Sequence, residues 1–129
     1  MILDSSAIVA IVQGEPEARL FAHLIEGAST LQIAAPTFVE TAVVLGRRRR
    51  EGVDRLLTGF GVEVVPFALE HAEAARVAYS RYGKGSGSPA RLNLGDCFSY
   101  ALATVSGQPL LFKGDDFTHT DVVAAAPPT

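Results

Sequence analysis

Short apolar runs alternate along the chain with longer segments whose apolar residues recur at helical spacing. The short runs predict buried strands at 1–4, 30–34, 62–66 and 109–112, and a further edge strand at 122–126. The longer segments, with their capping residues and glycine stops, predict helices at 5–13, 16–26, 36–50, 68–82 and 94–106, and a short helix with a turn at 52–61. The inner stripe of the helix at 68–82 is predicted to comprise Leu69, Ala72, Ala75 and Tyr79. The glycine- and serine-rich stretch at 83–89 predicts a flexible loop.

Strands separated by helices predict an α/β fold, an α/β/α sandwich around a central, mostly parallel sheet. The chain shows no internal repeat and no linker, so residues 1–129 are predicted to form a single domain. Ligands of such sheets bind beyond the carboxyl ends of the strands. Functional residues are therefore expected just after strands or at the starts of the following helices.

Composition narrows the class of protein. Hydrophobic residues make up 48% of the 129 residues and charged residues 19%, which suits one packed core rather than a disordered chain. The single cysteine cannot form a disulfide framework, and the amino-terminal residues lack the basic region of a signal peptide. The longest uncharged run, 97–112, is too short to cross a bilayer. We expect a cytoplasmic protein with no membrane anchor.

Charge argues against a protein that coats nucleic acid. The formal net charge is −3, so charge alone would not hold a long polyanion. A short stretch of RNA could still be held by a local basic patch. One such patch is Arg47–Arg50, which is otherwise expected to be a solvated helix end, and a second comprises Arg76, Arg81, Lys84 and Arg91.

Acidic residues stand at the positions where ligands of a parallel sheet are expected. Asp4 closes the first strand, although a helix N-cap is the favoured explanation when Asp4 is considered alone. Glu40 lies among apolar residues early in its helix, where burial is costly unless it pairs with a cation such as Arg47 or a metal. Asp96 follows the N-cap-like Asn93 by three residues, which would also fit a capping box. Asp115 and Asp116 follow the last strand, in what could be an ordinary turn.

The joint placement of these acids favours a metal site over four separate structural roles. Carboxylates that converge repel one another, so a fold is not expected to assemble them without a cation. Oxygen ligands without a histidine or cysteine set indicate Mg²⁺ or Mn²⁺ rather than Zn²⁺. A cation held in this way can orient water and stabilise charge on a phosphodiester.

Four segments resemble the PIN-domain ribonucleases, and among them the VapC-type toxins of type II toxin–antitoxin pairs. They run in the family's order nearly from end to end: Ile2–Ala7, Pro36–Glu40, Leu92–Ala101 and Leu110–Phe117. The resemblance implies the PIN fold and a Mg²⁺-dependent endoribonuclease. It implies that Asp4 and Asp96 are the principal metal ligands and that Glu40 completes the acidic site. It favours Asp116 over Asp115 as the fourth acid.

The resemblance also implies partners and a supporting residue. Ser6 occupies the family's Ser/Thr position near the first acid. A cognate VapB-type antitoxin, an RNA substrate and a toxin homodimer are implied in the same way.

Other functions are weighed against this one. Receiver domains and haloacid-dehalogenase-type phosphotransferases also place an aspartate after the first strand, but Ser6 stands where the latter need a second aspartate, and 62–66 lacks the receiver's phospho-accepting aspartate. A non-enzymatic alternative is an inactive PIN-like module that binds RNA or protein. Cys97 is expected to be a packed thiol rather than a nucleophile. His23 and His71 are expected on ordinary helix faces, and His119 on a surface loop.

Overall fold

Four short strands with alternating inward and outward side chains form the centre of the molecule. They are β1 (Ile2–Leu3), β2 (Gln32–Ala34), β3 (Glu63–Val65) and β4 (Leu110–Leu111) in a computed structural model that describes residues 1–127. The strands pair in the order β3-β2-β1-β4, and each of the three pairings is parallel. Each lies within a predicted strand segment, and the parallel sheet is confirmed.

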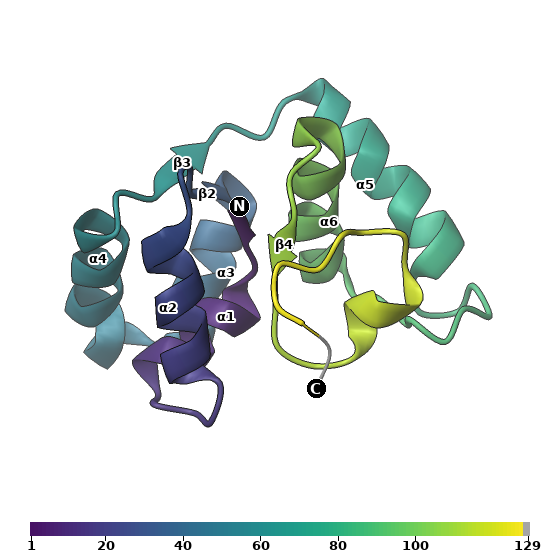
Figure 1. Ribbon diagram of the computed structural model, residues 1–129. Coiled ribbons are helices and arrows are strands. Elements are labelled where there is room, and N and C mark those ends of the chain that lie inside the picture. Colours follow the sequence, from purple (N-terminus) through teal and green to yellow (C-terminus); the bar gives the residue numbers. More distant parts are fainter. Residues whose placement is uncertain (128–129) are drawn as a thin grey trace.

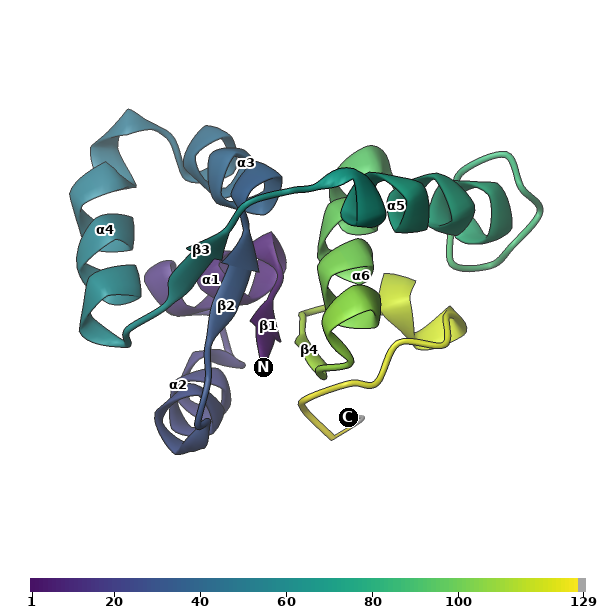
Figure 2. The same ribbon diagram turned by 90° about the horizontal axis from the view of Figure 1, so that it is seen from above.

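Helices cover both faces of this sheet (Figures 1 and 2). The α-helices are α1 (Ser5–Val12), α2 (Ala18–Gly27), α3 (Ala35–Leu45), α4 (Arg50–Gly59), α5 (Leu69–Tyr82) and α6 (Leu94–Ser106). Two short 3₁₀ turns, η1 (Arg47–Arg49) and η2 (Asp116–His119), complete the elements. The arrangement is the predicted α/β/α sandwich.

The two faces of the sheet bury separate apolar cores. Ile2 and Leu110 pair in register and face the core made with α5 and α6. Leu3 and Leu111, the next residues along the same two strands, face the core made with α1, α2 and α4. Successive residues of a strand thus face opposite sides of the sheet. Because helices cover both sides of a parallel sheet, the predicted strands are apolar throughout.

The connections bring several element ends to one edge of the sheet. Helices α1 and α3 begin directly after β1 and β2, at the carboxyl ends of those strands. Helix α6 precedes the parallel strand β4, so it runs back across the sheet and its first turn lies at the same edge. The long 83–92 connection before α6 is held by a bridge between Gly83 and Leu92.

The predicted long helix at 36–50 is wrong. Helix α3 ends at Leu45, and Gly46 follows with φ +78°, a left-handed conformation that interrupts the helix. The arginine run then forms η1 and the start of α4. Arg50 therefore begins a helix instead of ending one, and the expected favourable contact with a helix carboxyl terminus does not arise there.

Two smaller predictions are wrong in whole or in part. In α5, Ala75 is buried as predicted, but Leu69 and Tyr79 are exposed, and the other buried residues are His71 and Ala78. The inner face is shifted because the helix buries the residues that meet α6, a partner that the sequence pattern alone does not position. The predicted edge strand at 122–126 is reduced to one isolated bridge, between Leu110 and Ala124. No helix within residues 1–127 is long and apolar enough to span a membrane.

Candidate active site

Asp4 is both a helix cap and a buried acid at the edge of the sheet. It directly follows β1, caps α1, and is 3% exposed. Its Oδ2 accepts hydrogen bonds from the backbone N–H of Ser6 at 3.1 Å and from the Ser6 hydroxyl at 2.6 Å. The Ser6 hydroxyl in turn accepts a hydrogen bond from the backbone N–H of Lys113 at 3.0 Å, which ties α1 to the segment after β4. The capping interpretation and the site interpretation are therefore compatible.

Glu40 is placed against the first turn of α6. A Cβ atom at Gly95 would overlap the Glu40 Oε2 atom, so glycine at this position leaves room for the Glu40 carboxylate where it lies. Burial raises the pKa of Glu40, the Asp4 carboxylate raises it further, and the Ser5 side chain opposes the shift. The Glu40 Oε1 atom is buried without a hydrogen-bond partner, and none of the ion pairs in residues 1–127 involves Glu40. The alternative of an ion pair with Arg47 is therefore not realised in this part of the chain.

Asp96 occupies the third position of α6 and completes a capping box. The backbone N–H of Asp96 donates to Asn93 Oδ1 at 2.8 Å, and Asp96 Oδ2 accepts from the backbone N–H of Asn93 at 3.0 Å. Burial raises the pKa of Asp96 to about 6 against the lowering effect of the Asn93 hydrogen bond, and the nearby carboxylates of Asp4, Asp116 and Glu40 add to the increase. All three carboxylates are thus close enough to disfavour a fourth negative charge.

The neighbouring acids Asp115 and Asp116 have different surroundings. Asp116 begins η2 and is exposed, and its charge acts on Asp96. Asp115 is also exposed and lines a groove on the other side of the same turn. Phe112 and Phe117 pack together with ring centroids 5.1 Å apart, which holds η2 against β4. The charge of Asp116 therefore acts on the acidic site, whereas Asp115 lines the groove, and the choice between them as the fourth acid stays a prediction.

The arrangement fits a cation better than it fits internal charge pairing. No lysine, arginine or histidine forms an ion pair with any of the four acids within residues 1–127. Across the same residues, no three histidine, cysteine, aspartate or glutamate side chains stand in a ready-made metal-holding arrangement. The orphaned Glu40 oxygen and the all-oxygen donor set nevertheless fit Mg²⁺ or Mn²⁺, hard cations that retain several water ligands and need few protein ones.

Two hydroxyl residues of the site were missed by the sequence reasoning. Ser99 is fully buried, and its hydroxyl donates to Asp4 Oδ1 at 2.5 Å. Thr37 is fully buried as well, and its Oγ1 lies 3.3 Å from Ser99 Oγ. The available signal was weak: Ser99 is a lone polar residue within the apolar run of α6, one turn after Asp96.

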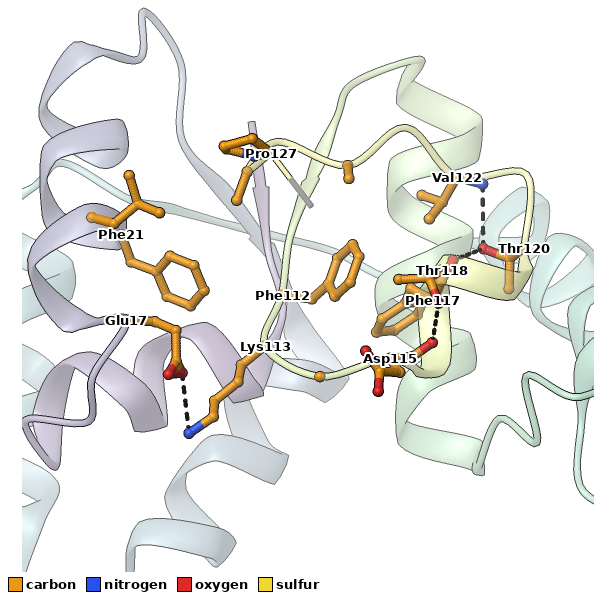
Figure 3. Close-up of a pocket in the computed structure, with 14 residues that line it drawn as sticks. Glu17, Phe21, Phe112, Lys113, Asp115, Phe117, Thr118, Thr120, Val122 and Pro127 are labelled. Carbon is orange, nitrogen blue, oxygen red and sulfur yellow. Dashed lines mark hydrogen bonds and ion pairs between the residues drawn. The ribbon is translucent and has the colours of Figure 1, made fainter. Parts of the chain in front are cut away.

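A groove lies beside the acids and does not contain them. It measures about 540 Å³ and lies between α2 and the carboxyl-terminal segment, and Phe21, Phe112 and Phe117 are among the residues that line it (Figure 3). At its mouth, Lys113 Nζ lies 3.1 Å from both Glu15 Oε1 and Glu17 Oε2. Lys113, the basic residue nearest in sequence to any of the four acids, is therefore already paired with these two glutamates.

The remaining reactive candidates are structural. Cys97 is fully buried, and burial together with the Asp96 charge raises the pKa of its thiol to about 11, which agrees with a packed thiol and not a nucleophile. His71 is not an ordinary surface residue as expected. It is 6% exposed, stacks against Phe67, and its Nδ1 accepts a hydrogen bond from the backbone N–H of Ala68 at 2.9 Å. His119 is exposed in η2.

Comparison with known proteins identifies the family of the chain. A sequence model of the PIN domain matches residues 1–123. The chain belongs to the PIN domain family. Ribonuclease VapC42 of Mycobacterium tuberculosis is 51% identical over 126 residues, covering 95% of this chain and 96% of that protein. Ribonuclease VapC of Mycolicibacterium smegmatis is 46% identical, covering 96% and 98%.

Solved structures share the fold of this PIN domain. Mycobacterium tuberculosis VapC20, described as a toxin that cleaves the sarcin–ricin loop, superposes with a TM-score of 0.77 at 17% identity and covers 98% of both chains. A chain of a toxin–antitoxin complex from Klebsiella pneumoniae superposes with a TM-score of 0.70 at 19% identity. Like its curated relatives, the chain is a VapC-type ribonuclease and is therefore a hydrolase.

Proposed function

We propose that Asp4, Glu40, Asp96 and Asp116 together hold Mg²⁺, with Mn²⁺ able to replace it, and that this site hydrolyses phosphodiester bonds within RNA. The observation that carries the proposal is the convergence of four acids from four separate elements with no basic partner within residues 1–127. Burying carboxylates in this way is unfavourable unless a ligand neutralises them. A divalent cation is the ligand that would neutralise them. The curated relatives are ribonucleases, which supports RNA as the substrate.

The contacts of the four acids suggest a different role for each pair. Asp4 and Asp96 are the principal ligands, because each is fixed by hydrogen bonds and each leaves acceptor capacity unused. The unpartnered Glu40 Oε1 can accept a proton from the attacking water, and the exposed Asp116 is the alternative acceptor. When bound, the cation would stabilise negative charge on the phosphodiester and lower the pKa of water.

A cleavage assay tests the proposal directly. Purified protein is incubated with total RNA in Mg²⁺, in EDTA, and in EDTA followed by excess Mn²⁺, and the new RNA ends are mapped. Discrete cuts are expected with either cation and none with EDTA. The Asp96→Asn variant, purified identically, controls for contaminating nucleases. Discrete metal binding without any cleavage would favour an inactive RNA- or protein-binding module instead.

A cognate VapB-type antitoxin is the proposed partner that restrains this activity in the cytoplasm. The support is the class of the relatives and the toxin–antitoxin complex among proteins of the same fold. Expression of the toxin alone should arrest growth, and co-expression of the neighbouring antitoxin gene should restore it. Growth arrest by Asp96→Asn to the wild-type extent would contradict the link between toxicity and cleavage.

A homodimer is the proposed assembly, and α3 offers a surface for it. Val39, Val43 and Val44 are 60%, 76% and 57% exposed on this helix, and Leu94 at the start of α6 is 63% exposed. Exposed apolar residues clustered beside a functional site are typical of an interface. Light scattering after gel filtration should give a dimer mass, and Val43→Glu should shift it to the monomer. Unchanged mass in Val43→Glu would place the interface elsewhere.

A further inference from the structure

Two basic side chains are held beside the start of α6. The connection between α5 and α6 returns to the end of α5 (Figure 1), where Gly83 and Leu92 form a bridge. The backbone N–H of Lys84 donates to the Leu92 carbonyl at 3.0 Å, which fixes the two arms of the connection against each other. Lys84 and Arg91, the neighbours of the bridged residues, are both exposed. The bridge therefore places two cations on the surface where α6 begins.

The first turn of α6 joins this surface to the acidic site. The backbone N–H of Asn93 donates to Asp96 Oδ2 at 3.0 Å, and Arg91 stands two residues before Asn93. Consecutive Cα atoms are about 3.8 Å apart, so the Cα of Arg91 lies within about 8 Å of the Cα of Asn93. Arg91 is thus attached to the helix end that carries Asp96, and an RNA strand bound at the acids can place a neighbouring phosphate there.

Arg91 adopts a backbone conformation that is unfavourable for arginine. Its φ is +50°, and within residues 1–127 it is the one residue other than glycine with a positive φ. Ala90 and Leu92 on either side are 0% exposed and belong to the core, so the backbone is fixed around an exposed side chain. This packing explains the conformation but not the arginine, because glycine would adopt the same φ without strain. Strain of this kind is typical of functional positions.

The four basic residues of this patch differ in what they contact. Arg76 pairs with Glu73 at 3.3 Å, and the guanidinium carbon of Arg81 lies 4.9 Å from the centre of the neighbouring tyrosine ring. None of the ion pairs within residues 1–127 involves Lys84 or Arg91. Lys84 and Arg91 are therefore the cations of the patch that are available to an anionic ligand.

We propose that Arg91, assisted by Lys84, binds a backbone phosphate of the RNA strand beside the phosphate that is cleaved. The inference rests on the proposed function of the acidic site. The net charge of −3 provides no general attraction for RNA, so cations close to the site have to hold the strand. A guanidinium group can bind a phosphate through two parallel hydrogen bonds. Such a contact fixes the position of the strand without reading its sequence.

Single-turnover cleavage of a short, labelled, single-stranded RNA in Mg²⁺ measures binding and chemistry separately. The half-saturating protein concentration reports RNA affinity, and the rate at saturation reports the chemical step. Both are measured over a range of salt concentrations for wild type and Arg91→Gly. Loss of one phosphate contact should lower the slope of log affinity against log salt by about 0.7, which is a loss of about fivefold at about 0.1 M salt relative to 1 M. The rate at saturation should stay within about twofold of wild type, because Arg91 does not contact the reacting phosphate.

The choice of glycine separates a binding role from a structural one. Because glycine adopts φ +50° without strain, Arg91→Gly should melt at or slightly above the wild-type temperature. An arginine needed only for the fold would instead give a lower melting temperature and an unchanged salt slope. Arg91→Lys keeps the charge and should restore the wild-type slope. Arg91→Asn carries the test if Arg91→Gly does not fold, because asparagine tolerates the left-handed conformation.

Arg48→Ala is the charge-matched control. Arg48 is exposed and lies in η1, beyond the carboxyl-terminal ends of α1 and α3, where Arg49 Nη1 donates to the Val12 carbonyl at 3.2 Å. Its salt slope should equal that of wild type. An unchanged slope in Arg91→Gly, or an equal fall in Arg48→Ala, would overturn the inference, and weaker antitoxin binding with an unchanged slope would assign Arg91 to the protein partner. Absence of cleavage by wild type would instead overturn the proposed function.

Discussion

The two ends of one parallel sheet are built from different chemistry. At the amino ends, Gln32 Nε2 donates to Glu63 Oε1 at 2.7 Å and Gln108 Nε2 donates to Gln32 Oε1 at 2.8 Å, which forms a ladder of two amides and one carboxylate across the strands, here called the amide ladder. The Thr30 hydroxyl also donates to Gln108 at 3.2 Å. At the carboxyl ends, the acidic groups are carboxylates that repel one another, and Glu40 Oε1 has no hydrogen-bond partner among residues 1–127.

The two ends of the sheet therefore differ in role: one contributes to stability and the other to function. The amide ladder satisfies its own hydrogen bonds, so this end needs no ligand. The acidic end holds charges that favour a bound cation over the free protein. Changes at the acidic end should therefore affect metal binding and catalysis more than folding, and changes at the amide end should do the reverse.

Asp96→Asn is expected to have the largest effect. Loss of a charged metal ligand should lower RNA cleavage by about a hundredfold or more. Asparagine can still accept the capping hydrogen bond of Asn93, so helix α6 should persist. Cleavage is measured under single-turnover conditions, and folding by circular dichroism. Near-wild-type cleavage would remove Asp96 from the site.

The same variant should stabilise the metal-free protein at neutral pH. The pKa of Asp96 is raised to about 6 in the folded state, so its stabilising contribution is present below the unfolded value of 3.8 and is lost as pH rises through about 6. At pH 7.5 Asp96→Asn should gain about 1 kcal/mol, because solvent screens part of the repulsion at this partly exposed carboxylate. Melting in EDTA at pH 7.5 and at pH 4 checks this, and the gain should vanish at pH 4.

Gly95→Ala tests whether the approach of α3 to α6 matters for chemistry. The added Cβ would displace the Glu40 carboxylate, which is the movable end of a side chain, so the free energy of unfolding should change by less than about 1 kcal/mol. Misplacement of a reacting group by about 1 Å can lower a rate by tenfold to a hundredfold. Gly52→Ala is the matched control, because a Cβ there meets nothing within 4 Å. Equal activity of the two variants would exclude a role for Glu40's position.

Proton competition should weaken metal binding at acidic pH. Burial and neighbouring carboxylates raise the pKa of Asp96 to about 6, and the pKa of Glu40 is raised as well, so protons occupy the ligands more readily than they occupy free carboxylates. Mn²⁺ affinity should fall by about tenfold per pH unit below pH 6 for each proton displaced. Titrations by electron paramagnetic resonance from pH 5 to 8 measure this. An affinity that is flat down to pH 5 would contradict it.

Gln108→Ala is expected to have the smallest effect on activity. It breaks the ladder at the amino end, where the hydrogen bonds of Thr30 and Gln32 are lost. The free energy of unfolding should fall by about 1 kcal/mol, as measured by urea denaturation. Cleavage and metal affinity should stay at the wild-type level. A parallel loss of metal affinity would show that the two ends of the sheet are coupled.

Particular elements show how far the sequence could predict the fold. The bounds of α6 were predicted correctly, because Asn93 gives a cap signal and Gly107 a stop signal. The continuous helix through the arginine run was wrong, because Gly46 adopts φ +78° and ends α3. The conformation of a single glycine within a helical pattern cannot be predicted from the sequence alone. The predicted buried face of α5 was right at Ala75 and wrong at Leu69 and Tyr79, since the position of α6, and not the apolar pattern, decides which residues are covered.

The sequence by itself determined the order of the elements, the parallel sheet and the candidate acids. Alternating apolar segments and local caps are properties of neighbouring residues, so they can be read along the chain. The tertiary structure decided which groups meet: Glu40 against Gly95, Asp116 rather than Asp115 near Asp96, and the Thr37–Ser99 chain on Asp4. Such contacts join residues up to 95 positions apart. Their hydrogen bonds depend on how the elements pack together, and such packing leaves no periodic pattern or fixed spacing in the local sequence.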